Sequence, residues 1–165
     1  MDDRAVVARQ IGRVPRAFRR VAVRCPFGRP AVTEQHPYDD GGSPFPTTYY
    51  LTCPHLVAAL SRLEAAGGVE RWSRAAADDA GLASSLARAD DDQRAVRREL
   101  AASGTGADGG ASLELGIGGA GRRGSLKCLH AHVAYALARP GYELGDRILA
   151  ELDPLWPQGR CCTVT

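Results

Sequence analysis

The chain has 165 residues, of which 44% are hydrophobic and 24% charged, and its formal net charge is +2. This length and composition are typical of one globular domain, and no apolar run approaches the roughly 20 residues of a membrane-spanning helix, which excludes a membrane-spanning protein. The N-terminus begins with acids and lacks the basic start and long apolar stretch of a secretory signal, which favours a cytoplasmic protein.

The first 30 residues are strongly basic although the whole chain is not. They carry eight arginines and two acids, a local excess of +6. Such a cluster could contact nucleic acid or an acidic protein partner. No recognised nucleic-acid motif accompanies it, so a solvated arginine-rich surface is the favoured interpretation.

The N-terminal third predicts a short helix and a small sheet. Asp2 or Asp3 can cap a short helix through Gln10, after which Gly12 and Pro15 interrupt it. Residues 20–24 and 31–34 alternate polar and apolar side chains around a turn, which predicts a hairpin with Cys25 where the first strand ends.

A loop with many glycine, proline and aspartate residues covers 37–46, and the β-branched and aromatic run 47–52 predicts a third strand. Pro54 is favoured at the first position of a helix, which makes Cys53 the cap. A thiolate is stabilised at that positive helix end.

The helix after Pro54 is expected to stop at Gly67-Gly68, and 69–102 reads as one or two surface helices. Residues 103–124 are glycine-rich and predict a flexible segment. Gly116, Gly118 and Gly121 match a dinucleotide-binding spacing, but no βαβ unit accompanies them.

The last third predicts two more helices. Ser125 can cap a helix over 126–138, and a short helix through 147–152 leads to the tail. In that register Cys128 lies in the first turn and shares a face with His132, while His130 points elsewhere.

Five cysteines are the recurring reactive group. In a reducing compartment an odd number suits metal ligation or thiol chemistry better than disulfides, and the alternative is that several are small buried hydrophobes. The leading hypothesis is a metal centre, because the cysteines lie at a strand end, a helix cap and a first helical turn. The expected ligands are Cys25, Cys53, Cys128 and one of Cys161 or Cys162, with His132 as a substitute.

The spacing of these ligands bears on the metal. Zinc sites usually show paired C-x-x-C knuckles, whereas these cysteines are spread singly, and two precede proline as in bacterial ferredoxins. The spacing therefore favours an iron–sulfur cluster over zinc, although four thiolates suit both.

A second hypothesis is a cysteine-dependent enzyme. Cys53 would attack an electrophile, His132 or His55 would act as base, and Asp146 would orient the base. A third is a metal-free binding protein that uses the arginine-rich N-terminal surface.

Several strings resemble a bacterial family known as domain of unknown function 501, found chiefly in actinobacteria. The most specific are Tyr-Tyr-Leu-Thr-Cys-Pro at 49–54 and Lys-Cys-Leu-His-Ala at 127–131, and Arg-Cys-Pro at 24–26 and Ser-Arg-Leu-Glu at 61–64 accompany them. The resemblance runs from about residue 8 to 156 and implies a housekeeping protein without an assigned activity. The chain departs from the family pattern over 70–123.

Together these patterns predict a single α+β domain over 1–165. A small antiparallel sheet of about three strands near the N-terminus is packed by four to five helices, with the glycine-rich segment 103–124 between them.

Overall fold

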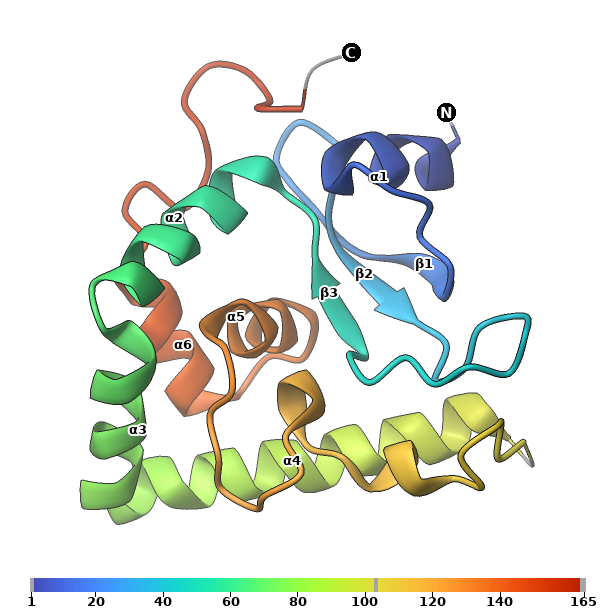
Figure 1. The fold of residues 1–165 in the computed structure, drawn as a ribbon. Helices are drawn as coiled ribbons and strands as arrows, with labels where there is room; N and C mark the ends of the chain where they lie inside the picture. Colours follow the sequence, from blue (N-terminus) through green and yellow to red (C-terminus); the bar gives the residue numbers. More distant parts are fainter. Residues whose placement is uncertain (1, 103, 164–165) are drawn as a thin grey trace.

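A three-stranded antiparallel sheet forms the N-terminal part of the fold (Figure 1). The computed structural model describes residues 2–102 and 104–163. The strands are β1 (Phe18–Arg24), β2 (Pro30–Gln35) and β3 (Tyr49–Leu51), in the order β1-β2-β3. The predicted hairpin and third strand are confirmed.

Both faces of the central strand are covered, so all six residues of β2 are buried. Thr33 pairs with Tyr50 and faces α1 (Asp3–Ile11), whereas Val32 pairs with Leu51 on the opposite face. That second face packs on α5 (Leu129–Ala138). The alternation of a strand thus places one helix on each side of the sheet.

The remaining helices lie around α5 (Figure 1). They are α2 (Pro54–Ala65), α3 (Gly68–Asp78), α4 (Ala80–Ala101) and α6 (Glu143–Ala150). In the described part of the chain six α-helices accompany the sheet, and the predicted α+β class is confirmed. None of these helices combines the length and apolar character that crossing a membrane requires.

Helix α5 is the central element of the core. Leu129, Val133 and Ala134 are completely buried, as expected for a helix that is apolar all round. It begins at Leu129 with Cys128 as its N-cap, three residues later than the sequence pattern predicts. The predicted cap at Ser125 is therefore wrong.

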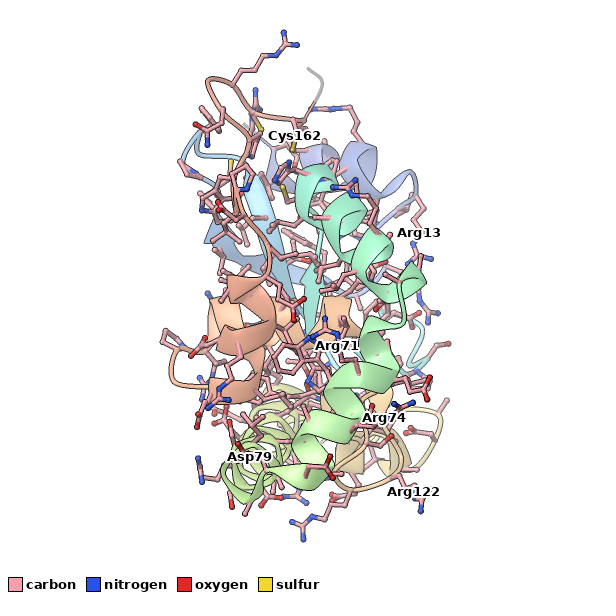
Figure 2. The ribbon with its side chains drawn as sticks, turned by 90° about the vertical axis from the view of Figure 1, so that its left-hand side faces the viewer. Arg13, Arg71, Arg74, Asp79, Arg122 and Cys162 are labelled. Carbon is pink, nitrogen blue, oxygen red and sulfur yellow. The ribbon has the colours of Figure 1, made fainter. Side chains whose placement is uncertain are left out.

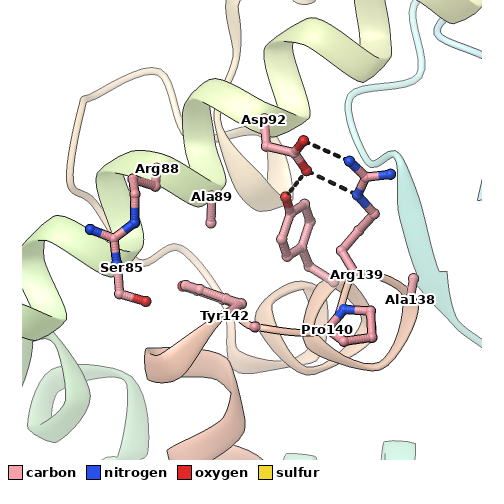
Figure 3. Close-up of a pocket in the computed structure, with 10 residues that line it drawn as sticks. Ser85, Arg88, Ala89, Asp92, Ala138, Arg139, Pro140 and Tyr142 are labelled. Atoms are coloured by element: carbon pink, nitrogen blue, oxygen red, sulfur yellow. Dashed lines mark hydrogen bonds and ion pairs between the residues drawn. The ribbon is translucent and has the colours of Figure 1, made fainter.

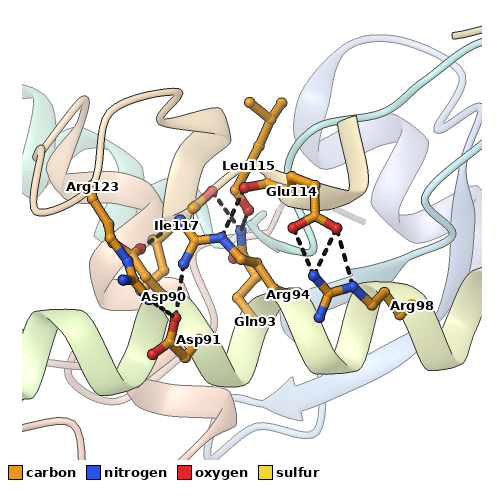
Figure 4. Close-up of polar contacts among 10 residues, drawn as sticks. Asp90, Asp91, Gln93, Arg94, Arg98, Glu114, Leu115, Ile117 and Arg123 are labelled. Atoms are coloured by element: carbon orange, nitrogen blue, oxygen red, sulfur yellow. Dashed lines mark hydrogen bonds and ion pairs between the residues drawn. The ribbon is translucent and has the colours of Figure 1, made fainter. Parts of the chain in front are cut away.

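Helix α4 carries a buried stripe of polar side chains that hydrogen-bond to the backbone of the glycine-rich segment (Figure 4). This segment forms two short 3-10 helices, η1 (Ala111–Glu114) and η2 (Ile117–Gly119). Asp90 Oδ1 accepts from Ile117 N at 2.9 Å, and Gln93 Nε2 donates to the Gly116 carbonyl. Side chains of α4 thus supply hydrogen bonds that a sheet or helix would otherwise make.

The flexibility predicted for 103–124 stays a prediction, and residue 103 lies outside the described residues.

Arg97 is the largest side chain that is fully buried. Its guanidinium donates to the carbonyls of Ser112 (3.1 Å), Phe45 (3.0 Å) and Pro46 (3.2 Å). It therefore joins α4 to the loop that enters β3 and to η1. The interpretation of 69–102 as surface helices overlooks this buried face.

We expect Arg97→Ala to lower the free energy of unfolding by roughly 3 to 5 kcal/mol, since it leaves buried carbonyls without donors and opens a cavity. Urea denaturation would measure the loss. Arg88→Ala is the matched control, because Arg88 is exposed on the same helix and its loss should change stability by about 0.5 kcal/mol or less. A loss below about 1 kcal/mol for Arg97→Ala would contradict the role given to this residue.

Candidate metal centre

The sheet brings Cys25 and Cys53 to the same end of the molecule. Strands β1 and β3 are both antiparallel to β2, so they run in the same direction and finish at one edge. Cys25 follows β1 directly and Cys53 follows β3 by two residues. Both are buried, at 6% and 2% exposure.

Backbone hydrogen bonds fix the two cysteines to the start of β2. Cys53 N donates to the Ala31 carbonyl at 3.3 Å, and Cys25 N donates to the Arg29 carbonyl at 2.9 Å. The Cys25 carbonyl accepts from Gly28 N at 2.9 Å in the turn, where Gly28 has a φ of 77°. Only a glycine adopts this conformation without strain, which explains the turn.

The C-terminal tail carries the other two cysteines to this place. It runs past the start of α2 toward α1 (Figure 1), and Cys162 lies at that end of the molecule (Figure 2). The sulfur of Cys162 is 3.6 Å from that of Cys53. We call Cys25, Cys53, Cys161 and Cys162 the four-cysteine cluster.

The side-chain amide of Gln10 helps to hold the tail in this position. Gln10 Nε2 donates to the Pro30 carbonyl at 2.8 Å and to Thr163 Oγ1 at 2.9 Å. It therefore links α1, β2 and the tail. Thr163 N in turn donates to the Cys161 sulfur at 3.4 Å.

The thiols of the cluster differ in acidity. Burial raises the pKa of Cys53 to about 12, although backbone N–H groups at the start of α2 oppose this, and the neighbouring Cys162 raises it further. The helix end therefore does not produce the thiolate that the sequence predicts, because desolvation outweighs it. Burial also raises the pKa of Cys161, but hydrogen bonds from Thr163 and the neighbouring thiols of Cys25 and Cys162 lower it overall.

Cys128 lies far from the four-cysteine cluster. It faces Glu64 at the other end of α2, eleven residues after Cys53, which corresponds to about 16 Å along a helix. The predicted ligands are therefore split: Cys25, Cys53 and the tail cysteines come together, and Cys128 does not join them.

His132 is also placed elsewhere. It is completely buried, and its Nδ1 is 2.7 Å from the Tyr142 hydroxyl. Cys128 is the N-cap of α5 and its backbone is extended, with a φ of −154°, so its side chain does not take the direction toward His132 that a helix from Leu126 would give it. Burial lowers the pKa of His132 to about 4, so it is neutral in the folded chain at neutral pH.

Cys128 instead lies beside His130. The ligand atoms of Glu64, Cys128 and His130 are all within 4.8 Å of one another. We call these residues the Glu–Cys–His triad. The Ser-Arg-Leu-Glu string at 61–64 and the Cys-x-His spacing at 128–130 are the sequence signals that could have indicated it.

The residues expected to take part in thiol catalysis do not gather around Cys53. His55 Nε2 is 3.0 Å from the Pro154 carbonyl, and His132 contacts Tyr142. Asp146 lies in α6, and burial raises its pKa. Within the described residues, no side-chain hydrogen bond joins Asp146 to either histidine.

Where the structure describes the chain, at least four of the eight N-terminal arginines pair with a total of three acids. Arg19 and Arg20 both pair with the buried Glu34, at 2.6 and 2.9 Å, and Arg24 pairs with Asp3 at 2.7 Å. Arg16 pairs with Asp39 at 3.1 Å. The local charge of this surface is therefore smaller than the sequence suggests.

A polar cavity of about 350 Å³ lies between α4 and the α5–α6 connection (Figure 3). Arg139 donates to both oxygens of Asp92, at 2.6 and 3.0 Å, and the Tyr135 hydroxyl donates to the same carboxylate. Asp92 thus neutralises Arg139, Arg88 leaves the lining with a net positive charge, and the lining contains no thiol.

The fold and the gathered thiols define an α+β protein with a candidate metal centre. The chain belongs to the family described as "Protein of unknown function (DUF501)", whose sequence model matches residues 21–150. Cys25, Cys53 and Cys128 lie within that range and the tail cysteines beyond it. No curated protein and no solved structure matches the chain.

The burial of His132 predicts an acid sensitivity. Its pKa of about 4 lies below the ordinary value of 6.5, so the unfolded chain binds a proton that the folded chain does not. The free energy of unfolding is therefore not reduced by His132 above about pH 6.5. It falls by about 3 kcal/mol in total as the pH drops toward 4, because the unfolded chain takes up the proton. Urea titrations across this range would measure it.

His132→Asn is the comparison for this measurement, since carboxylates also titrate at low pH. The stability difference between the wild type and the variant should shrink by about 3 kcal/mol from pH 7 to pH 4. A constant difference would show that His132 is not the group responsible.

Proposed function

We propose that the chain is a metalloprotein whose centre is bound by the four-cysteine cluster. The observation that carries this proposal is the convergence of four free thiols from three separate parts of the chain: the end of β1, the cap of α2 and the tail. Thiolates of cysteine are the ligands that iron–sulfur clusters and structural zinc sites share.

The position of the tail favours a ligand role over simple packing. From residue 151 onward the described tail forms no helix or strand, and termini are usually poorly ordered unless something ties them down. Cys161 and Cys162 nevertheless pack on the core. A metal bound by both the sheet end and the tail would add its binding energy to that contact.

The spacing of the four sulfurs favours an iron–sulfur cluster over a single zinc ion. Four thiolates at about 2.3 Å from one zinc ion lie about 3.8 Å apart, and the 3.6 Å between Cys53 and Cys162 fits this value. However, the structure describes all four sulfurs of the four-cysteine cluster, and no three of them lie within 4.8 Å of one another, as a single zinc ion would require. A cluster with two or more irons separates its thiolates more widely, so an iron–sulfur cluster is our first choice and zinc the alternative.

Two other functions have weaker support. A cysteine-dependent enzyme needs an accessible thiolate, whereas Cys53 is buried and its pKa is raised. A binding protein for nucleic acid or an acidic partner needs available positive charge, and several N-terminal arginines are paired with acids.

The first experiment is iron, zinc and acid-labile sulfide analysis of the full chain purified without oxygen, with a visible spectrum. We expect iron and sulfide in the wild type and the loss of both in Cys53→Ser, together with a lower melting temperature, because the metal contributes to folding. Zinc in place of iron, lost in the same variant, would select the alternative metal.

Cys128→Ser is the matched control, since Cys128 is a half-buried cysteine outside the cluster. It should retain iron and sulfide, whereas Cys161→Ser with Cys162→Ser should lose them. A metal-free wild type, or iron retained when Cys53 is replaced, would refute the proposed centre.

A further inference from the structure

The Glu–Cys–His triad is built by two helix ends that meet. Glu64 lies in the last turn of α2, and its Oε1 accepts from Leu129 N, the first residue of α5, at 2.6 Å. Cys128 precedes that residue as the N-cap, and His130 follows it. The side chains of Glu64 and His130 are each 25% exposed, so the place is partly buried but open to water.

The hydrogen-bond partners of His130 leave its Nδ1 able to act as a metal ligand. Its Nδ1 is 3.1 Å from Glu64 Oε1, and its Nε2 is 3.2 Å from the Val57 carbonyl. Nε2 is also 3.3 Å from the Ser61 hydroxyl, which can donate or accept, so either ring nitrogen of a neutral imidazole can carry the proton. In the tautomer whose Nε2–H donates to Val57, Nδ1 carries no proton and faces the carboxylate, so a positive ion can be bound by both.

This arrangement is typical of a metal-ligating histidine, which usually donates its second ring N–H to a carbonyl or carboxylate. Oxygen and nitrogen ligands at about 2.0 to 2.2 Å from one tetrahedral zinc ion lie about 3.3 to 3.5 Å apart. The 3.1 Å between Glu64 Oε1 and His130 Nδ1 is close to that separation.

We propose that Glu64, Cys128 and His130 form a second metal site, which takes a Zn²⁺ ion through a carboxylate oxygen, a thiolate and Nδ1. One carboxylate and one thiolate balance the charge of the ion. The donor set of oxygen, sulfur and nitrogen suits zinc rather than magnesium or calcium, which prefer oxygen ligands alone.

Three protein ligands leave one position of a tetrahedral zinc ion for water or a substrate, as in catalytic zinc sites. Among the described residues no further histidine, cysteine or acid joins the triad to close it. The site is therefore of the open kind, unlike a structural centre with four protein ligands.

Burial raises the pKa of Cys128, the backbone N–H of Ala131 opposes the rise, and the charge of Glu64 adds to it. A bound cation would reverse this effect, because a metal ion deprotonates a coordinating thiol.

The test is a Zn²⁺ titration of the full chain carrying Cys161→Ser and Cys162→Ser, in competition with a coloured chelator. These two changes remove half of the four-cysteine cluster, which shares no residue with the triad, so the two proposals can fail separately. We expect one equivalent of zinc to bind. His130→Gln, Glu64→Gln or Cys128→Ser in this background should weaken binding at least tenfold.

His36→Gln is the matched control, because His36 is an exposed histidine remote from the triad, and it should leave the zinc affinity unchanged. With Co²⁺ as the probe, the sulfur-to-metal absorption band should be present in the background chain and absent with Cys128→Ser. In the otherwise unchanged chain, His130→Gln should lower the zinc stoichiometry by one equivalent, which provides a test even if the double serine variant folds poorly.

Zinc binding that is absent from the background chain, or equal with and without His130→Gln, would overturn the proposal. Glu64 would then only cap α5 and hydrogen-bond with His130.

Discussion

The pairing of β2 with a neighbour on each side is the constraint on which the rest of the structure depends. Because both neighbours are antiparallel to it, their ends coincide, and the residues that follow them meet beyond one edge of the sheet. The Ala31 carbonyl of β2 accepts hydrogen bonds from both Thr52 N and Cys53 N, which fixes the chain that follows β3 to this edge. The start of α2, the hairpin turn and the tail are all positioned from this edge.

The sequence predicts those elements whose ends are determined locally. Pro26 and Gly28 specify the hairpin turn, and Pro54 specifies the start of α2, so the places of Cys25 and Cys53 follow from residues next to them. The convergence of both with the tail is only a hypothesis at the level of the sequence, because the tail has no periodic pattern. The tail is held in part by Gln10 and His55, which are both remote from it in sequence.

The start of α5 shows the opposite case. Ser125 is a good local cap, yet the helix begins later because Glu64, from another helix, accepts the hydrogen bond of Leu129 N. This tertiary contact changes which histidine lies beside Cys128. Likewise, the buried stripe of α4 is polar, so a search for apolar periodicity does not detect that Asp90 and Arg97 face the core.

The position of Glu64 has an electrostatic consequence for α2 and α5. A carboxylate in the last turn of α2 faces the partial negative charge of that helix end, which disfavours it. The same carboxylate meets the first N–H of α5, where the partial charge is positive. The Glu64 carboxylate therefore destabilises the end of α2 and stabilises the start of α5. The angle at which the two helices meet sets how close the carboxylate lies to each partial charge.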